Sequence, residues 1–118
     1  MAAACRSGQV AVVDLLVKRG FDVRQHGVEP LCEAVNARQA AVVELLLAAG
    51  ADVHGVNSYA WTPLHFAAWI GDQGLVERLL AAGASPAAVD GQGREPASWA
   101  EEAGNAAIVA RLRAAAGG

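Results

Sequence analysis

The side chains that could carry chemistry are few: the cysteines Cys5 and Cys32 and the histidines His26, His54 and His65. A thiol or an imidazole can act as nucleophile, general base or metal ligand, but only when a partner group lies within reach. No two of these residues are three or four positions apart, as metal ligands on one helical face would be. The long separation of the two cysteines fits no common zinc spacing, and two thiols do not make a disulfide framework. The sequence therefore predicts no metal site and no cofactor.

Two other local patterns could suggest catalysis. Glu101 and Glu102 are adjacent carboxylates, but consecutive residues of a helix point in different directions, so we interpret both as solvated helix surface. The segment Gly91-Gln92-Gly93 is rich in glycine but precedes no Gly-Lys-Ser/Thr, so it does not fit a phosphate-binding loop. We therefore expect a protein that is not an enzyme.

The composition excludes several classes of protein. Hydrophobic residues make up 54% of the chain but aromatic residues only 5%, which favours closely packed helices built from alanine, leucine and valine. The net charge is -3, and nine Lys and Arg among twelve Asp and Glu provide no basic face for nucleic acid. No run of about 18 apolar residues could span a membrane. Residues 1–8 lack the features of a secretory signal, so we expect a soluble, cytoplasmic protein.

An internal repeat organises the chain. Residues 42–51 read Val-Val-Glu-Leu-Leu-Leu-Ala-Ala-Gly-Ala, and residues 75–84, which begin 33 positions later, read Leu-Val-Glu-Arg-Leu-Leu-Ala-Ala-Gly-Ala. Pro30, Pro63 and Pro96 follow one another at the same interval. This period indicates a stack of small, similar units.

Each unit is predicted to contain two short helices followed by a turn. The first helix should begin near the proline, because the N–H that proline lacks would be unpaired in a first helical turn anyway. Thr62 is a suitable N-cap for such a helix, whereas Glu29 and Glu95 are poorer ones. The second helix carries a Val-Val-x-Leu-Leu pattern with helical spacing. It should end at a glycine that suits a left-handed C-cap: Gly20, Gly50 or Gly83.

Residues 62–68, Thr-Pro-Leu-His-Phe-Ala-Ala, resemble the ankyrin signature T-P-L-H-x-A-A, and residues 71–84 complete a near-consensus unit. The resemblance extends over essentially the whole chain. It implies a single all-α domain over residues 1–118, an ankyrin-repeat solenoid of stacked helix-turn-helix units joined by short β-hairpin-like finger loops. The expected units are 1–23, which is truncated, 24–53, 54–86 and 87–113, with a frayed tail at 114–118.

Three departures from the family pattern affect the ends and one loop. The first unit lacks the Thr-Pro pair, so its first helix is expected to be cut short. The second unit is shorter than the third between Val23 and Pro30, so its finger loop should be stunted. The last unit carries Arg111 and Arg113 where earlier units are mostly apolar, and a polar outer face suits a C-terminal cap. The first unit has no such polar cover.

The resemblance also implies structural roles for the candidate catalytic residues. In this family the signature histidine steadies the turn and the helix start by hydrogen bonding, which is the role expected of His65. Cys32 and Ser98 occupy the same repeat position as His65, which indicates a packing and hydrogen-bonding role rather than a catalytic triad. Cys32 and His65 should also lie about 10 Å apart, the spacing of adjacent packed helices. Cys5 is expected to be a small buried side chain.

Ankyrin proteins bind partners mainly through the turn tips and the exposed positions of each first helix. Three of the six aromatic residues of this chain, Tyr59, Trp61 and Trp69, fall at such positions in the third unit. Large aromatic side chains dominate binding hot spots. We therefore expect a monomer that binds another protein, and neither nucleic acid nor membrane, on the concave and finger surface of units three and four. The expected contact residues are Val56, Ser58, Tyr59, Trp61, Trp69, Ile70, Gln92, Arg94 and Glu102.

Other interpretations stay open at this point. Trp61 and Trp69 could instead pack against the next unit, as Phe66 and Trp99, which share one repeat position, are expected to do. The chain could also be structural, as part of a longer stack or as a unit that self-associates. The open face of the first unit would then be covered; it comprises Val10, Val12, Val13 and Leu16. Finally, His54 follows an Asp-Val pair, a place that is hydroxylated in some eukaryotic ankyrin proteins.

Overall fold

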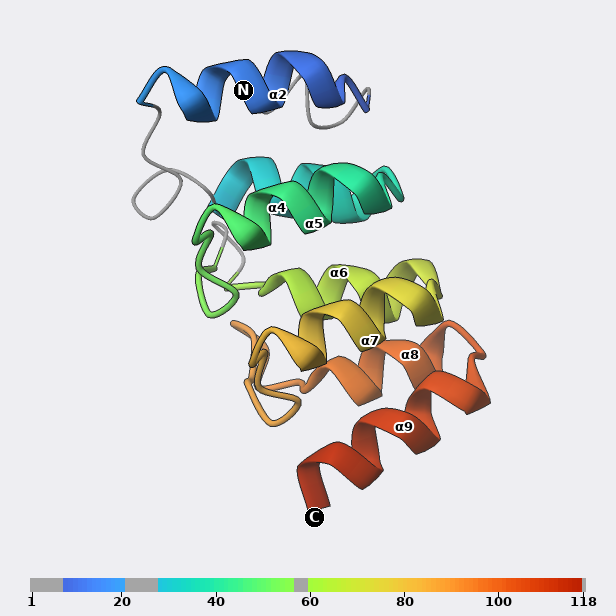
Figure 1. Ribbon diagram of the computed structural model, residues 1–118. Helices are drawn as coiled ribbons and strands as arrows, with labels where there is room; N and C mark the ends of the chain where they lie inside the picture. Colours follow the sequence, from blue (N-terminus) through green and yellow to red (C-terminus); the bar gives the residue numbers. More distant parts are fainter. Residues whose placement is uncertain (1–7, 21–27, 57–59, 118) are drawn as a thin grey trace.

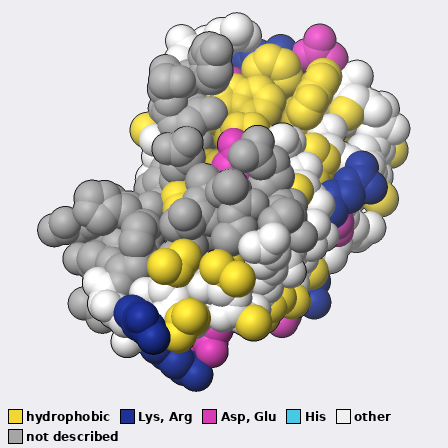
Figure 2. Space-filling model, turned by 90° about the horizontal axis from the view of Figure 1, so that it is seen from above, with side chains coloured by type: hydrophobic (Ala, Val, Ile, Leu, Met, Phe, Trp, Pro, Cys, Tyr) yellow, Lys and Arg dark blue, Asp and Glu magenta, His cyan; other side chains and the backbone are white. Residues whose placement is uncertain are grey.

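The computed structural model describes residues 8–20, 28–56 and 60–117 (Figure 1). These residues form seven α-helices and no strand: α2 (Val10–Lys18), α4 (Val28–Asn36), α5 (Ala40–Ala48), α6 (Pro63–Ile70), α7 (Gln73–Ala81), α8 (Pro96–Glu102) and α9 (Ala106–Gly117). They build an elongated stack, with principal extents of 40 × 23 × 21 Å, that begins at α2 and ends at α9. The view from the α2 end shows hydrophobic side chains among charged ones at that surface (Figure 2). The all-helical solenoid expected from the sequence is confirmed.

The helices pair within units and stack between them. The first helices α4, α6 and α8 lie side by side, with α4 packed on α6 and α6 packed on α8. Each of them also packs on the second helix of its own pair, which is α5, α7 or α9. At the other end of the stack, α2 packs on α5. Because helices this short are marginal by themselves, the contacts with neighbours must stabilise them.

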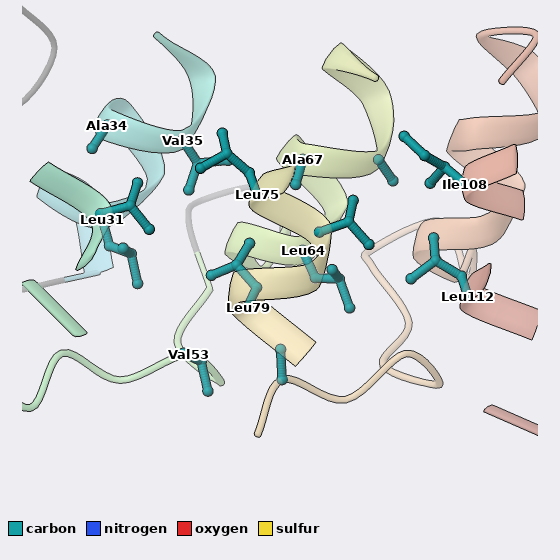
Figure 3. Packing of buried hydrophobic residues seen from close by; sticks show 14 of the residues in the cluster. Leu31, Ala34, Val35, Val53, Leu64, Ala67, Leu75, Leu79, Ile108 and Leu112 are labelled. Carbon is teal, nitrogen blue, oxygen red and sulfur yellow. The ribbon is translucent and has the colours of Figure 1, made fainter. Parts of the chain in front are cut away.

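Equivalent positions of the second helices define two rows of buried residues along the stack, and Figure 3 labels Leu75 and Ile108 of one row and Leu79 and Leu112 of the other. All six residues of the rows are 0% exposed: Val42, Leu75 and Ile108 in one row and Leu46, Leu79 and Leu112 in the other. In the first helices the small residues Ala34, Ala67 and Ala100 are also completely buried. Small side chains at these positions let neighbouring first helices approach closely. The interval at which the sequence repeats is therefore also the interval at which buried core positions recur.

The observed helix starts agree in part with those predicted from the sequence. Thr62 caps α6, because its hydroxyl accepts a hydrogen bond from the backbone N–H of His65. Glu95 makes no side-chain capping bond at the start of α8, as expected for a poorer cap. The expectation for Glu29 as a cap is wrong: α4 begins at Val28, so Glu29 lies inside the helix and Pro30 is its third residue. A proline is tolerated there, because the first four N–H groups of a helix have no partner within the helix.

The glycines that follow the second helices have left-handed backbone angles. Gly20, Gly50 and Gly83 have φ values of 99°, 97° and 97°, and the helices before them end at Lys18, Ala48 and Ala81. Their backbone N–H groups donate to carbonyl oxygens in the last turn of the helix. A residue with a Cβ would be strained at such φ values, so glycine allows the chain to leave the helix here.

The last helix differs from expectation in two details. Residues 114–117, which the sequence assigns to a frayed tail, continue α9, consistent with the high helix propensity of their alanines. Arg111 does not simply face solvent: its Nε donates to Oε1 of Glu77 on α7 at 2.5 Å. One unit earlier, the Nε of Arg78 donates to Oε1 of Glu44 on α5 at 2.6 Å. These arginines link α9 to α7 and α7 to α5.

We expect Leu79→Ala to lower the free energy of unfolding by about 2–5 kcal/mol, because it opens a cavity in a completely buried row. Urea denaturation followed by circular dichroism measures the change. The matched control is Leu15→Ala, since Leu15 is 50% exposed on α2; this change should cost less than about 1 kcal/mol. Equal losses in the two variants would contradict the buried-row account.

Candidate protein-binding surface

Four aromatic side chains meet where α6 packs against α8. Trp61 precedes α6, Phe66 and Trp69 lie on α6, and Trp99 lies on α8. The ring centroids of Trp61 and Trp99 are 4.9 Å apart, those of Trp61 and Phe66 are 5.0 Å apart, and those of Trp69 and Trp99 are 5.6 Å apart. These distances are those of favourable offset and edge-to-face aromatic pairs. We call these four residues, together with Arg94 and Glu102, the aromatic surface.

The repeat explains why these side chains meet. Phe66 and Trp99 are separated by one period of the repeat, so stacking α6 on α8 brings their positions side by side. Trp69 is three positions after Phe66, which puts both on one face of α6. In the following unit, Arg94 stands at the position of Trp61 and Glu102 stands at the position of Trp69. The aromatic surface is therefore shared by two consecutive helix pairs.

Trp99 is held from two sides. Its indole Nε1 donates to Oδ2 of Asp90 at 2.7 Å. The guanidinium carbon of Arg94 lies 3.9 Å from the ring centroid of Trp99, a cation–π contact. Nη2 of Arg94 is 2.7 Å from Oε2 of Glu102, whose side chain is 52% exposed. The orientation of this ring therefore depends on polar groups of the loop before α8.

Asp90 organises that loop. Its Oδ1 accepts hydrogen bonds from the backbone N–H of Gln92 at 2.8 Å and of Arg94 at 3.0 Å. Burial by itself would raise the pKa of Asp90, but the hydrogen bonds from Arg94, Trp99 and Gln92 favour the charged carboxylate, and the pKa lies below its ordinary value of 3.8. The loop is thus closed around an ionised carboxylate.

His65 ties α6 to the same loop. The carbonyl oxygen of Arg94 accepts from Nε2 of His65 at 3.0 Å, so Nε2 carries the proton. Nδ1 then accepts from the backbone N–H of Thr62 at 3.2 Å. His65 is 0% exposed, and burial is the main reason why its pKa lies below 6.5, although Arg94 and Asp90 act to raise it. This geometry fits the structural role expected of the signature histidine.

The structure brings together only part of the predicted contact set. Trp61, Trp69 and Arg94 each contact the ring of Trp99, and Glu102 joins them through its ion pair with Arg94. Trp69 is 44% exposed, Glu102 is exposed, and Trp61, Ile70 and Arg94 are partly buried. Val56 and Gln92 are exposed in loops before α6 and α8, outside the ring contacts. Ser58 and Tyr59 lie outside the described residues.

The described ranges include the candidate residues Cys32, His54 and His65, whereas Cys5 and His26 lie outside them. Among these residues no three His, Cys, Asp or Glu side chains are grouped so that they could hold a metal ion. Cys32, at the repeat position of His65, is buried with 5% exposure. For the part of the chain that the structure covers, no helix is long and apolar enough to cross a membrane.

Comparison with known proteins agrees with the stacked helix pairs. Residues 1–57 match the family model described as ankyrin repeats (3 copies), and residues 59–91 match the one described as ankyrin repeat. The chain belongs to the ankyrin-repeat family. It is also 36% identical over 75 residues to the RelA-associated inhibitor of Mus musculus. That match covers 61% of this ankyrin chain but only 9% of the mouse protein.

Some residues of this ankyrin surface were not in the predicted contact set. Phe66 and Trp99 were expected to pack between units. Trp99 does contact the rings of Trp61 and Trp69 of the preceding unit, whereas the ring of Phe66 contacts Trp61 of its own unit. Asp90 was not singled out as a site residue, although an aspartate in a Gly-rich turn next to a tryptophan-bearing helix is a recognisable signal. Arg38 was also missed: its Nη2 donates to the carbonyl oxygen of Ile70 at 2.8 Å, a contact between distant parts of the sequence that no local pattern reveals.

The burial of neutral His65 predicts a pH dependence of stability. Because the pKa of His65 is lower in the folded chain than its ordinary value of 6.5, the unfolded chain binds more protons near that pH. The contribution of His65 is therefore complete above pH 6.5 and decreases as the pH falls below it. Urea denaturation of the wild type and of His65→Gln at several pH values between about 5 and 8 measures this. The free energy of unfolding should fall less on acidification in His65→Gln than in the wild type. An equal fall in both chains would contradict this role of His65.

Proposed function

We propose that this ankyrin chain is a non-catalytic protein–protein interaction module that binds its partner on the aromatic surface. Trp69 is the observation that carries the proposal: it is 44% exposed although its ring meets that of Trp99 at 90°. A large ring that is held in place and still open to solvent loses little conformational entropy on binding. Such side chains are typical anchors of protein interfaces.

The neighbours of Trp69 are suited to surround a bound partner. Arg94 and Glu102 form a charged pair beside the rings, with exposed side-chain fractions of 31% and 52%. Val56 and Gln92 add exposed groups from the finger loops. An apolar centre with a polar rim is the usual anatomy of an interface. We propose Ser58 and Tyr59 as further contacts, from sequence position alone.

The rest of the proposal follows from the family. We propose that the chain acts in the cytoplasm, without catalysis, cofactor or nucleic acid, and that its repeat units divide near residues 23, 53, 86 and 113. The name of the mouse relative says that it is an inhibitor associated with RelA. That name supports the general idea that such repeats engage another protein.

We expect Trp69→Glu to weaken partner binding at least about tenfold, which is about 1.4 kcal/mol. Affinity capture from the source cell, followed by titration of the captured protein, measures this effect. Trp69 is the suitable position because Trp61 contacts three other rings and its replacement would disturb packing. The matched control is Ala81→Glu, which adds the same charge at an exposed position of α7. Equal binding by both variants would contradict the proposal.

A second candidate function, self-association, is favoured by the exposed face of α2. Val12 and Leu16 align with Val42 and Leu46 on α5, which are 0% exposed, yet Val12 is 43% exposed. Leu15 is 50% exposed and Val10 is 39% exposed on the same helix. In the interior of the stack, such side chains are covered by a neighbouring helix pair. A second copy of the chain could cover them with its own α2 face.

For self-association, we expect sedimentation equilibrium to show a monomer–dimer equilibrium over about a hundredfold range of protein concentration. Leu15→Glu should abolish the dimer because it adds a charge to the apolar face. Val89→Glu is the control, since Val89 is 57% exposed in the loop before α8. A monomer throughout the range, or the same dimer in Leu15→Glu, would contradict this candidate and leave the partner-binding proposal intact.

A further inference from the structure

The side chain of Arg94 indicates which chemical group the aromatic surface accepts. Its guanidinium carbon lies 3.9 Å from the ring centroid of Trp99, and its Nη2 lies 2.7 Å from Oε2 of Glu102. The same Nη2 also donates to the carbonyl oxygen of Ser98, at 3.4 Å. A stacked ring, a carboxylate and a carbonyl oxygen together form a receptor for a planar cation. The chain fills this receptor with its own arginine.

The side chain of Arg94 does not hold the loop together. The backbone N–H of Arg94 donates to Asp90, and its carbonyl oxygen accepts from His65. The carbonyl oxygen also accepts from the backbone N–H of Asp90 at 3.0 Å. These backbone bonds would persist if the guanidinium moved away. The side chain can therefore be replaced without unfolding the loop.

Exchange of one guanidinium for another would cost little. The ion pair of Arg94 with Glu102 is partly exposed, and ion pairs of this kind contribute little net stability because water solvates both charges. An incoming arginine would recover the contacts with Trp99 and Glu102. It would also lie beside Trp69, whose ring is perpendicular to that of Trp99 and 44% exposed.

The charges around the receptor favour a cationic partner. The exposed residues at and next to α8 include three acids, Glu95, Glu101 and Glu102. Glu101 is paired with Arg113 and Glu102 with Arg94, so one acid is in excess while Arg94 is in place, and a second acid loses its partner when Arg94 moves away. The chain as a whole carries a net charge of -3. A basic segment of a partner would therefore be attracted to this face, and an acidic one repelled.

We propose that the aromatic surface binds an arginine side chain from a peptide segment of the partner, which displaces Arg94 from the ring of Trp99 and pairs with Glu102. The inference rests on the proposed function, because it assigns the chemistry of the same surface. Arginine is preferred over lysine, since a planar guanidinium stacks on an indole and pairs with a carboxylate in one orientation. In the bound state Arg94 turns towards solvent.

The test is a titration of the isotope-labelled chain, followed by the indole N–H resonances of its three tryptophans. The probe is the peptide acetyl-Ala-Leu-Arg-Leu-Ala-amide, and its control replaces the arginine by citrulline, an uncharged group of nearly the same shape. We expect the arginine peptide to shift the Trp99 and Trp69 indole signals saturably and the citrulline peptide to bind at least about threefold more weakly. Equal affinity for both peptides, or no saturable shift with either, would overturn the proposal.

Two variants separate displacement from simple addition to the surface. Arg94→Gln should strengthen binding of the arginine peptide about two- to fivefold, because the internal competitor is gone. Glu102→Gln should weaken it by a similar factor. Arg78→Gln, which removes an arginine paired with Glu44 on the second helices, is the control and should leave the affinity unchanged. If Arg94→Gln binds the arginine peptide more weakly than the wild type does, while the indole chemical shifts of the free variant show that its fold is native, displacement of Arg94 is contradicted.

The outcomes also distinguish this inference from the proposed function. If Trp69→Glu loses the natural partner but the arginine peptide does not bind, the surface binds its partner by other chemistry and only the inference fails. If the arginine peptide binds but Trp69→Glu retains the partner, the site accepts a guanidinium but is not the partner-binding surface, and the proposed function fails.

Discussion

The structure depends on one constraint: each helix pair can bury its apolar residues only against the next pair. The completely buried second-helix residues, such as Leu46, Leu79 and Leu112, recur at equivalent positions of successive units. Alanines at matching positions of the first helices allow those helices to come close together. The stability of any unit is therefore shared with its neighbours, as in other one-dimensional stacks. The same constraint leaves the apolar side chains of Val10, Val12 and Leu15 exposed on α2, the first helix of the described stack.

Stacking also creates the candidate site. Two aromatic positions that lie one repeat apart in the sequence, Phe66 and Trp99, become neighbours only when α6 packs on α8. The loop before α8 then adds the polar contacts that orient Trp99, through Asp90 and Arg94. Residues of two neighbouring units therefore form this surface, and neither unit alone contains all of it. It combines rigid rings with an exposed ion pair, which is a common composition for a binding surface.

The sequence predicts the fold well because the fold is encoded in local, repeated signals. The cap at Thr62, the glycines after the second helices and the buried leucines each follow from a short pattern. The start of α4 was less predictable, because its proline is the third residue of the helix and the helix starts further upstream than the proline suggests.

The candidate site was only partly predictable from the sequence. Repeat position identified Trp61 and Trp69 as exposed aromatic residues or as packing residues, and the structure gives both kinds of contact: each ring meets Trp99, and Trp69 stays 44% exposed. Whether each ring is exposed or packed depends on its orientation, which is determined by side chains of another unit. The contacts of Arg94 with Trp99 and of Arg111 with Glu77 likewise depend on three-dimensional distances.

The central claim is that a partner protein lies over the aromatic surface shared by α6 and α8. The most direct measurement is photo-crosslinking in the source cell, with benzoylphenylalanine placed either at position 69 on α6 or at position 81 on α7. We predict that position 69 gives a crosslink to one partner protein and that position 81 gives none. Crosslinks from position 81 alone would contradict it, because they would put the partner on the layer of second helices instead.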